Sequence, residues 1–249
     1  NDKMQPCLDI LKEKGLLTYS DGAQVVNLDE YDMPPCLLVK GDGATLYATR
    51  DIAAAYYRAK TYDFYKCLYV VAYQQNLHFK QLFKVLELMG FEKAKDMEHV
   101  AFGMVSLEDG AMKTRLGRVV WLSDVLDRAV EKAKSIIEEK RTDGIDVDKT
   151  AESVGVGAVV FSALWNSRIK DITFSFDKVL NFDGETAPYV QYTHARCCSV
   201  LKKGGEIDMT KINLDAIANE EGVAVAKSII GFADAVKRAA QTREPSVVT

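Results

Sequence analysis

The feature of the sequence that most constrains its fold is a strand–helix–strand succession in the N-terminal half. Cys67–Ala72 (CLYVVA) is a short, wholly apolar run, which is typical of a buried parallel strand. Apolar residues then recur at helical spacing over Leu77–Gly90, and His99–Val105 (HVAFGMV) has the composition of a second strand. This order predicts a βαβ unit with parallel strands and a right-handed crossover.

Shorter elements are predicted ahead of this unit, where turn residues separate apolar stretches. They are a helix over residues 3–17 that stops near Gly15, strands over Gln24–Leu28 and Cys36–Lys40, a hairpin into Thr45–Ala48, and a helix over Asp51–Lys60.

Between residues 120 and 150 the sequence pattern changes from alternating strands and helices to helices alone. Ser123–Lys140 has the pattern of a charged amphipathic helix with Ser123 as its N-cap, and a polar linker follows. Helical stretches are predicted near 151–167, 187–203 and 220–241. The sequence therefore predicts an α/β domain over residues 1–142, with a parallel sheet, followed by an all-α helical bundle domain over residues 143–249.

Composition narrows the environment and the partners. The net charge of −4 gives no overall basic field, so any nucleic-acid contact has to come from a local patch. Five cysteines without a CxxC pair favour a reducing cytoplasm over a disulfide scaffold. The three histidines have no metal-ligand spacing, so we expect no bound zinc. No apolar run is long enough to predict a membrane span.

Tyr47, Asp51 and Gln75 form the first candidate site. Tyr47 and Asp51 stand four residues apart at the start of a predicted helix, and Gln75 follows the strand Cys67–Ala72. A phenol, a carboxylate and an amide at a strand end suit a small cationic ligand such as a guanidinium. Spacing alone favours a plainer interpretation, in which Asp51 complements the helix dipole from the first turn and Tyr47 belongs to the core.

The loop from Met112 to Arg118 is a second candidate. Its three cations, at Lys113, Arg115 and Arg118, could neutralise charge developing on a triphosphate. A solvated basic loop is the alternative, since many surface loops contain such triplets.

A third candidate surface lies on the helix predicted near 187–203. Tyr189, Tyr192 and Arg196 fall at spacings of three and four residues, so they share one face and could stack unpaired bases. The alternative, favoured by periodicity alone, is that the tyrosines pack against a neighbouring helix and Arg196 snorkels away from it.

Four stretches taken together resemble the arginyl-tRNA synthetases, a family of class I synthetases. They are ATLYATRDIAAAYYR at 44–58, LYVVAYQQNLHFKQLFKVLELMGF at 68–91, HVAFGMVSLEDGAMKTR at 99–115 and NFDGETAPYVQYTHAR at 181–196. The resemblance covers nearly the whole chain. It implies the second half of a Rossmann-type catalytic domain over 1–142 and the start of a helical anticodon-binding domain over 143–249.

The resemblance also implies an activity. Such an enzyme uses ATP and Mg²⁺ to adenylate L-arginine and then transfers the arginyl group to tRNA(Arg), in the cytoplasm and away from membranes. We expect the full-length protein to be a monomer. The implied site residues are Tyr47, Asp51 and Gln75 for arginine, Gly103, Met104, Val105 and Met112 for ATP, Lys113, Thr114 and Arg115 for catalysis, and Tyr189, Tyr192 and Arg196 for tRNA.

The chain departs from the family pattern in two places. The signature loop, often KMSTRKG in the family, differs here at three positions. Ala111 and Leu116 stand where lysines are usual, and Lys113 stands where a serine is usual. The HIGH-type motif, which stabilises the α-phosphate in class I synthetases, does not occur in the chain. We therefore expect both ends to be cuts through a longer protein and the fragment alone to be catalytically inactive. A non-catalytic arginine- or tRNA-binding fragment and another class I synthetase are the alternatives.

Overall fold

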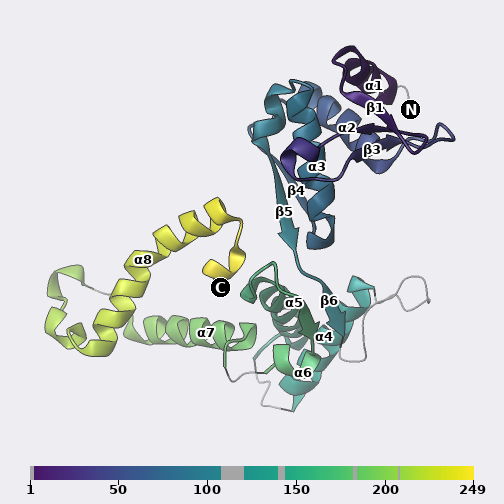
Figure 1. Ribbon diagram of the computed structural model, residues 1–249. Coiled ribbons are helices and arrows are strands. Elements are labelled where there is room, and N and C mark those ends of the chain that lie inside the picture. Colours follow the sequence, from purple (N-terminus) through teal and green to yellow (C-terminus); the bar gives the residue numbers. More distant parts are fainter. Residues whose placement is uncertain (1–2, 108–120, 140–143, 182–183, 207) are drawn as a thin grey trace. The chain divides into compact units, whose positions relative to one another are not determined.

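The computed structural model describes residues 3–107, 121–139, 144–181, 184–206 and 208–249, and it divides into two compact units. Unit 1 is Asn1–Phe102 and unit 2 is Gly103–Thr249 (Figure 1).

Unit 1 combines a small antiparallel sheet with a βαβ unit. Its elements in chain order are α1 (Met4–Glu13), β1 (Leu17–Ser20), β2 (Ala23–Val26), η1 (Asp29–Tyr31), β3 (Cys36–Val39), α2 (Tyr47–Tyr62), β4 (Cys67–Ala72), η2 (Tyr73–Gln75), α3 (Asn76–Leu88), η3 (Glu92–Asp96) and β5 (Met97–Phe102). The strands β1, β2 and β3 pair antiparallel in that order. The strands β4 and β5 pair parallel, in register from Cys67↔Met97 to Ala72↔Phe102, so the predicted βαβ unit is confirmed.

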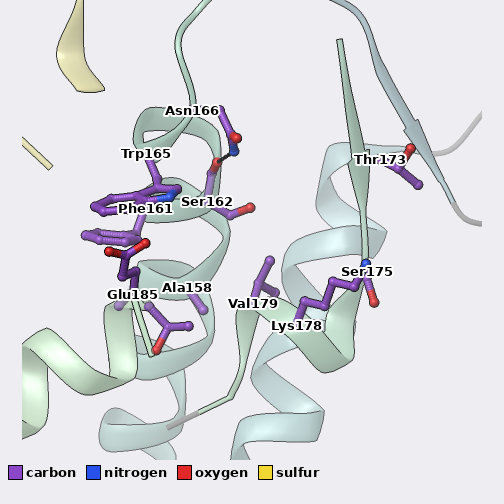
Figure 2. Close-up of a pocket in the computed structure, with 12 residues that line it drawn as sticks. Ala158, Phe161, Ser162, Trp165, Asn166, Thr173, Ser175, Lys178, Val179 and Glu185 are labelled. Carbon is purple, nitrogen blue, oxygen red and sulfur yellow. Dashed lines mark hydrogen bonds between the residues drawn. The ribbon is translucent and has the colours of Figure 1, made fainter. Parts of the chain in front are cut away.

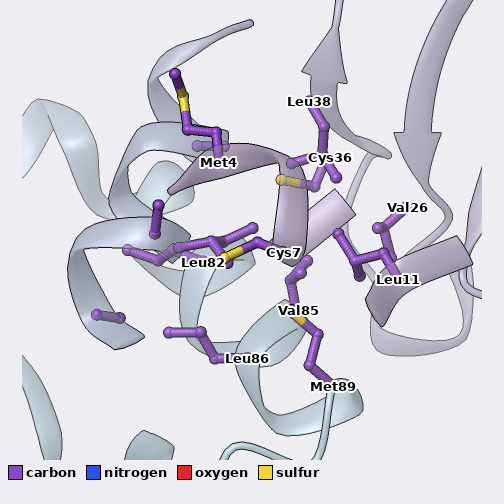
Figure 3. Packing of buried hydrophobic residues seen from close by; sticks show 14 of the residues in the cluster. Met4, Cys7, Leu11, Val26, Cys36, Leu38, Leu82, Val85, Leu86 and Met89 are labelled. Atoms are coloured by element: carbon purple, nitrogen blue, oxygen red, sulfur yellow. The ribbon is translucent and has the colours of Figure 1, made fainter. Parts of the chain in front are cut away.

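Three helices and the antiparallel sheet share the core of unit 1 (Figure 3). Leu82, Val85 and Leu86 of α3 and Met89 at its C-cap follow the spacing of one helix face, and all four are buried. Cys36 on β3 lies in the same cluster, and burial raises the pKa of its thiol to about 12. This thiol therefore stays protonated and serves as a small apolar side chain.

Three predictions for unit 1 are wrong in detail. The predicted strand Thr45–Ala48 is reduced to a single bridge between Val39 and Thr45, because α2 begins at Tyr47. His99–Val105 is not one strand, since β5 ends at Phe102. The run in β4 is only partly buried: Val70 is 64% exposed, because β4 has one strand partner among the described residues and one open face.

Unit 2 is mainly helical but contains a parallel strand pair. Its elements are β6 (Val105–Leu107), α4 (Leu122–Glu138), α5 (Val147–Trp165), β7 (Ile172–Phe174), α6 (Phe176–Val179), α7 (Ala187–Gly204), η5 (Met209–Lys211), η6 (Leu214–Ile217), α8 (Glu220–Thr242) and η7 (Pro245–Val247). The three long helical stretches predicted from the sequence correspond to α5, α7 and α8. The pairing of β6 with β7 was not predicted.

Small residues let α4 and α5 approach closely. Ala129, Ala133, Ala151 and Ala158 are buried, and Gly155 faces the backbone of α4. Ser123 is not the N-cap of α4, because the helix begins at Leu122 after Trp121. Among the described residues, no helix is both long and apolar enough to cross a membrane.

The segment after α8 is hydrogen-bonded to residues 167–168, which follow α5. The Glu244 carboxylate accepts hydrogen bonds from the Arg168 backbone N–H (3.1 Å) and the Ser167 hydroxyl (3.3 Å). The Arg168 side chain donates to the Arg243 carbonyl at 2.8 Å. Burial raises the pKa of Glu244, but the hydrogen bonds from Ser246, Arg168 and Ser167 outweigh it, so the net shift is downward.

The first prediction concerns the α4–α5 contact. A Cβ atom on Gly155 would lie 2.7 Å from the Val130 Cα atom, so alanine requires a backbone shift. Overpacking of this kind costs about 1–3 kcal/mol, which exceeds the ~1 kcal/mol that alanine contributes to helix propensity. We expect Gly155→Ala to lower the melting temperature of unit 2 in calorimetry. Gly231→Ala on α8, where the Cβ meets open space, is the matched control and should raise it or leave it unchanged.

The second prediction concerns the contribution of Glu244 to stability at low pH. Because the pKa of Glu244 is lowered in the folded state, its contribution to stability is present above the unfolded pKa of about 4.3 and is lost as the pH falls below it. Glu244→Gln should therefore destabilise the protein at pH 7, by no more than about 1 kcal/mol because the group is partly exposed. Denaturant titrations of wild type and variant should converge near pH 3; a constant difference would show that ionised Glu244 is not responsible.

Candidate functional site

The candidate site in unit 1 lies at the carboxyl end of β4. This strand ends at Ala72, and the turn η2 leads directly into α3, which begins at Asn76. Gln75 is the exposed residue just before the helix. Ligands of open parallel sheets bind beyond the carboxyl ends of the strands, so this turn is a suitable place for a ligand.

The helix α2 carries the other two candidates. Tyr47 is its first residue and is 76% exposed, with the Arg50 guanidinium carbon 5.8 Å from the centre of its ring. This exposure rules out the interpretation of Tyr47 as a core residue. Asp51 is the fifth residue of α2, and the first turn contains no acidic residue. The proposed dipole role of Asp51 in the first turn is therefore also wrong.

Asp51 instead pairs with a histidine from the next helix. The His78 Nε2 atom lies 2.8 Å from Asp51 Oδ2, and the two side chains are 22% and 34% exposed. The Asp51 carboxylate is thus neither in bulk solvent nor sealed in the core. The pair joins the second turn of α2 to the first turn of α3, and Gln75 precedes His78 by three residues. Tyr47 and Gln75 each stand about one helical turn from a member of the pair.

His78 was missed by the sequence analysis, which examined the histidines only for metal-ligand and phosphate-motif spacing. The position of His78, one helical turn after Gln75, could have identified it as a candidate site residue. A row of aromatic rings supports it: His78 meets the Phe79 ring edge-on at 5.1 Å, and Phe79 stacks on His99 at 4.3 Å. His99 Nε2 donates to the Val71 carbonyl of β4 at 2.9 Å, which anchors the row to the strand.

The chemistry of this site suits a planar cation better than a metal ion. An ionised carboxylate has about four acceptor positions, and His78 uses one of them. Tyr47, four residues before Asp51, and Gln75, three residues before His78, carry a neutral hydroxyl and a neutral amide. Among the described residues, no group of three or more His, Cys, Asp or Glu side chains could hold a metal ion.

The residues expected at ATP lie at the start of unit 2. Gly103 donates its N–H to the Arg168 carbonyl at 2.7 Å, and a Cβ atom there would overlap the Lys170 backbone. Met104 donates to Asp171 Oδ1 at 2.7 Å. The N–H groups of Gly103 and Met104 are thus used within the fold, whereas the apolar side chains of Met104 and Val105 are exposed. Met112, Lys113, Thr114 and Arg115 lie outside the described residues.

The three candidates on α7 are all exposed. Arg196 Nη1 donates to the Tyr192 hydroxyl at 3.4 Å, and its guanidinium carbon lies 5.6 Å from the Tyr192 ring centre. Tyr189 and Tyr192 are 50% and 53% exposed. The alternative in which both tyrosines are covered by a neighbouring helix is therefore wrong for the described part of the chain.

Unit 2 also contains a small cavity, of about 200 Å³, between α5, β7 and the start of α7 (Figure 2). Phe161 and Trp165 stack in its wall with ring centres 5.6 Å apart. The cavity is smaller than the roughly 300 Å³ of a typical ligand pocket, and it contains none of the predicted site residues.

Comparison with known proteins finds two family models, one after the other along the chain. The family model described as the catalytic domain of class I tRNA synthetases (R) matches residues 1–176, and the DALR anticodon binding domain matches residues 190–249. The arginine–tRNA ligase of Clostridioides difficile is 55% identical over 250 residues, which cover 100% of this chain and 44% of the relative. The enzyme of the same name from Halothermothrix orenii is 52% identical over the same share of each chain.

Solved structures agree with these relatives. The arginyl-tRNA synthetase of Thermus thermophilus has a TM-score of 0.86 and 26% identity, over 99% of this chain and 47% of that one. The Plasmodium falciparum enzyme has a TM-score of 0.80 and 26% identity, over 98% and 42%. The chain spans about 44% of the length of the curated relatives it matches. It belongs to the arginyl-tRNA synthetase family of class I tRNA synthetases.

Proposed function

We propose that the protein to which this chain belongs is an arginine–tRNA ligase, which activates L-arginine with ATP and transfers it to tRNA(Arg). The observation that carries the proposal is the Asp51 carboxylate, held by His78 at the carboxyl end of β4 with acceptor positions to spare. A carboxylate in this setting matches the fork of donors on a guanidinium. Relatives at 52–55% identity that are named arginine–tRNA ligases support the assignment.

In this proposal the arginine side chain lies between α2 and η2. Asp51 and the Tyr47 hydroxyl contact the guanidinium, while the Gln75 amide lines the rest of the amino-acid pocket. Tyr47 and Asp51 lie in the first two turns of α2, and Gln75 ends the short helix that follows β4, so regular backbone holds each of them in position. Main-chain rigidity of this kind is what a specific small-molecule site requires.

ATP, with Mg²⁺, is proposed to bind at the start of unit 2. Met104 and Val105 present exposed apolar surface that suits adenine, and Gly103 allows the chain to pass close to Lys170. Magnesium at such sites is held largely by the phosphates and water. When bound, ATP supplies the activated phosphate. Lys113, Thr114 and Arg115, in the loop with Met112, are the proposed partners of the charge that develops on that phosphate.

The tRNA is proposed to contact α7. Tyr189, Tyr192 and Arg196 present two aromatic faces and a guanidinium on exposed surface. Stacking of unpaired bases on such groups is tolerant of sequence, and the guanidinium adds attraction for the phosphates. The match of residues 190–249 to an anticodon binding domain supports this role.

The third prediction tests the arginine site. Asp51→Asn removes the negative charge but keeps the size of the side chain, so a charge-assisted bidentate contact worth about 2–4 kcal/mol is lost. In pyrophosphate exchange by the full-length enzyme with tRNA present, the KM for arginine should rise by roughly thirtyfold or more. Asp63→Asn, at the exposed C-cap of the same helix, is the control and should leave the KM unchanged. An unaltered KM in Asp51→Asn would refute the assignment.

The fourth prediction tests the tRNA surface. Loss of one stacked base costs about 1–3 kcal/mol, so Tyr192→Ala should weaken tRNA(Arg) binding between fivefold and a hundredfold, roughly, in a filter-binding assay. Tyr192→Phe keeps the ring and should bind like wild type. Tyr19→Ala on β1 removes another highly exposed tyrosine and serves as the surface control. Equal weakening by Tyr19→Ala and Tyr192→Ala would argue against a specific role of α7.

A further inference from the structure

We propose that His78 is a positioning residue for the amino-acid substrate, and that it acts by fixing the orientation of the Asp51 carboxylate. The inference rests on the proposed function, because it takes Asp51 as the group that receives the guanidinium. It adds a residue to that site and assigns a separate task to it. The observation behind it is the contact of 2.8 Å between His78 Nε2 and Asp51 Oδ2.

The direction of this hydrogen bond follows from the chemistry of the partners. An ionised carboxylate can only accept, so the proton lies on His78 Nε2 and the imidazole is the donor. The bond requires a single N–H and therefore does not require a charged imidazole. A neutral donor leaves the negative charge of Asp51 available to a cationic ligand, whereas a lysine or arginine in the same place would compete with that ligand.

The bond restricts a side-chain torsion that is otherwise soft. The terminal torsion of an aspartate has a broad, roughly two-fold energy profile, so an unsupported carboxylate on a helix surface samples many orientations. Bidentate recognition of a guanidinium needs the carboxylate plane in one orientation. A donor from α3 that holds Oδ2 fixes this plane relative to both helices. The free-energy cost of ordering the carboxylate when the ligand binds is therefore smaller.

The two members of the pair differ in relative exposure. The Asp51 side chain is 34% exposed and the His78 side chain 22%, so the histidine is the more covered of the two. Phe79, whose ring is in edge-to-face contact with His78, is buried, and it stacks on His99. His78 is thus supported from the protein side, and the Asp51 side chain keeps the larger exposed fraction.

The support of His78 leads back to the strand that forms the site. His99 lies on β5 opposite Tyr69 of β4 and donates to the carbonyl of Val71. The row His78–Phe79–His99 therefore connects Asp51 to the last residues of β4, directly before η2 and Gln75. We infer that this row keeps the carboxylate and the amide of the site in a constant relation to each other.

The test compares two substitutions of His78 in the full-length enzyme by steady-state pyrophosphate exchange. His78→Leu removes the donor, and we expect the KM for arginine to rise tenfold or more, with kcat and the KM for ATP within about twofold of wild type. His78→Gln places an amide N–H near the position of Nε2 and should restore the KM for arginine to within about threefold of wild type. This difference between the two variants would not arise from a purely structural role.

Gln81→Leu is the matched control on the same helix. Gln81 donates to the Pro34 carbonyl at 2.7 Å, so its loss also removes a hydrogen bond between α3 and another segment, but it does not touch Asp51. We expect Gln81→Leu to lower the melting temperature without changing the KM for arginine. An increase in KM equal to that of His78→Leu would overturn the proposal, because loosening of α3 would then explain both.

The outcomes separate this proposal from the proposed function. If Asp51→Asn raises the KM for arginine but His78→Leu does not, His78 has no positioning role and the arginine site stands. If neither substitution raises it, the arginine site itself is refuted. In a double variant, His78→Leu should add little to the effect of Asp51→Asn, since the donor acts through the carboxylate; fully additive effects would overturn the proposal.

Discussion

The parallel pairing of β4 with β5 determines where the candidate residues of unit 1 can lie. Parallel strands bring their carboxyl ends to one edge, and α3 is the crossover that begins at this edge. The turn that contains Gln75 and the first turn of α3 that contains His78 are therefore next to the strand end. Asp51 reaches the same place from α2 because it bonds to His78 across the two helices.

The Asp51–His78 pair contributes more to orientation than to stability. Both side chains are partly exposed, and pairs of this kind contribute about 0–1 kcal/mol, which is small beside the cost of disturbing a core residue. The buried face of α3, with Leu82, Val85 and Leu86, holds the helix in place whether or not the pair forms. The fold can therefore tolerate the loss of the pair, while ligand affinity is expected to depend on it.

Much of the fold was predictable because it depends on local pattern. The helices α3, α5, α7 and α8 have clear apolar periodicity or end signals, and Gly90 after α3 has a φ of +75°, which its position as a helix stop requires. The position of the α4 N-terminus was not predictable from Ser123, since its hydroxyl bonds to the neighbouring Asp124 side chain and does not cap the helix.

Contacts between residues that are far apart in the sequence could not be predicted from the sequence. Ser106 of β6 meets Thr173 of β7 across 67 positions, and Asp51 meets His78 across 27. Gly103 is a further case, because only the close approach of the Lys170 backbone explains why a glycine interrupts the strand predicted over His99–Val105. The roles of Tyr47, Asp51 and Gln75 were inferred from family resemblance, and the structure adds the partner that the resemblance did not supply.

In the proposed site the Asp51 carboxylate of α2, fixed by His78, selects a cationic side chain. Calorimetric titration of the full-length protein with arginine and with citrulline, its neutral ureido analogue, tests this claim most directly. A charge-assisted hydrogen bond is worth roughly twice a neutral one, so arginine should bind at least tenfold or so more tightly than citrulline. Equal affinities for the two amino acids would contradict the account, because the charge of Asp51 would then make no contribution to recognition.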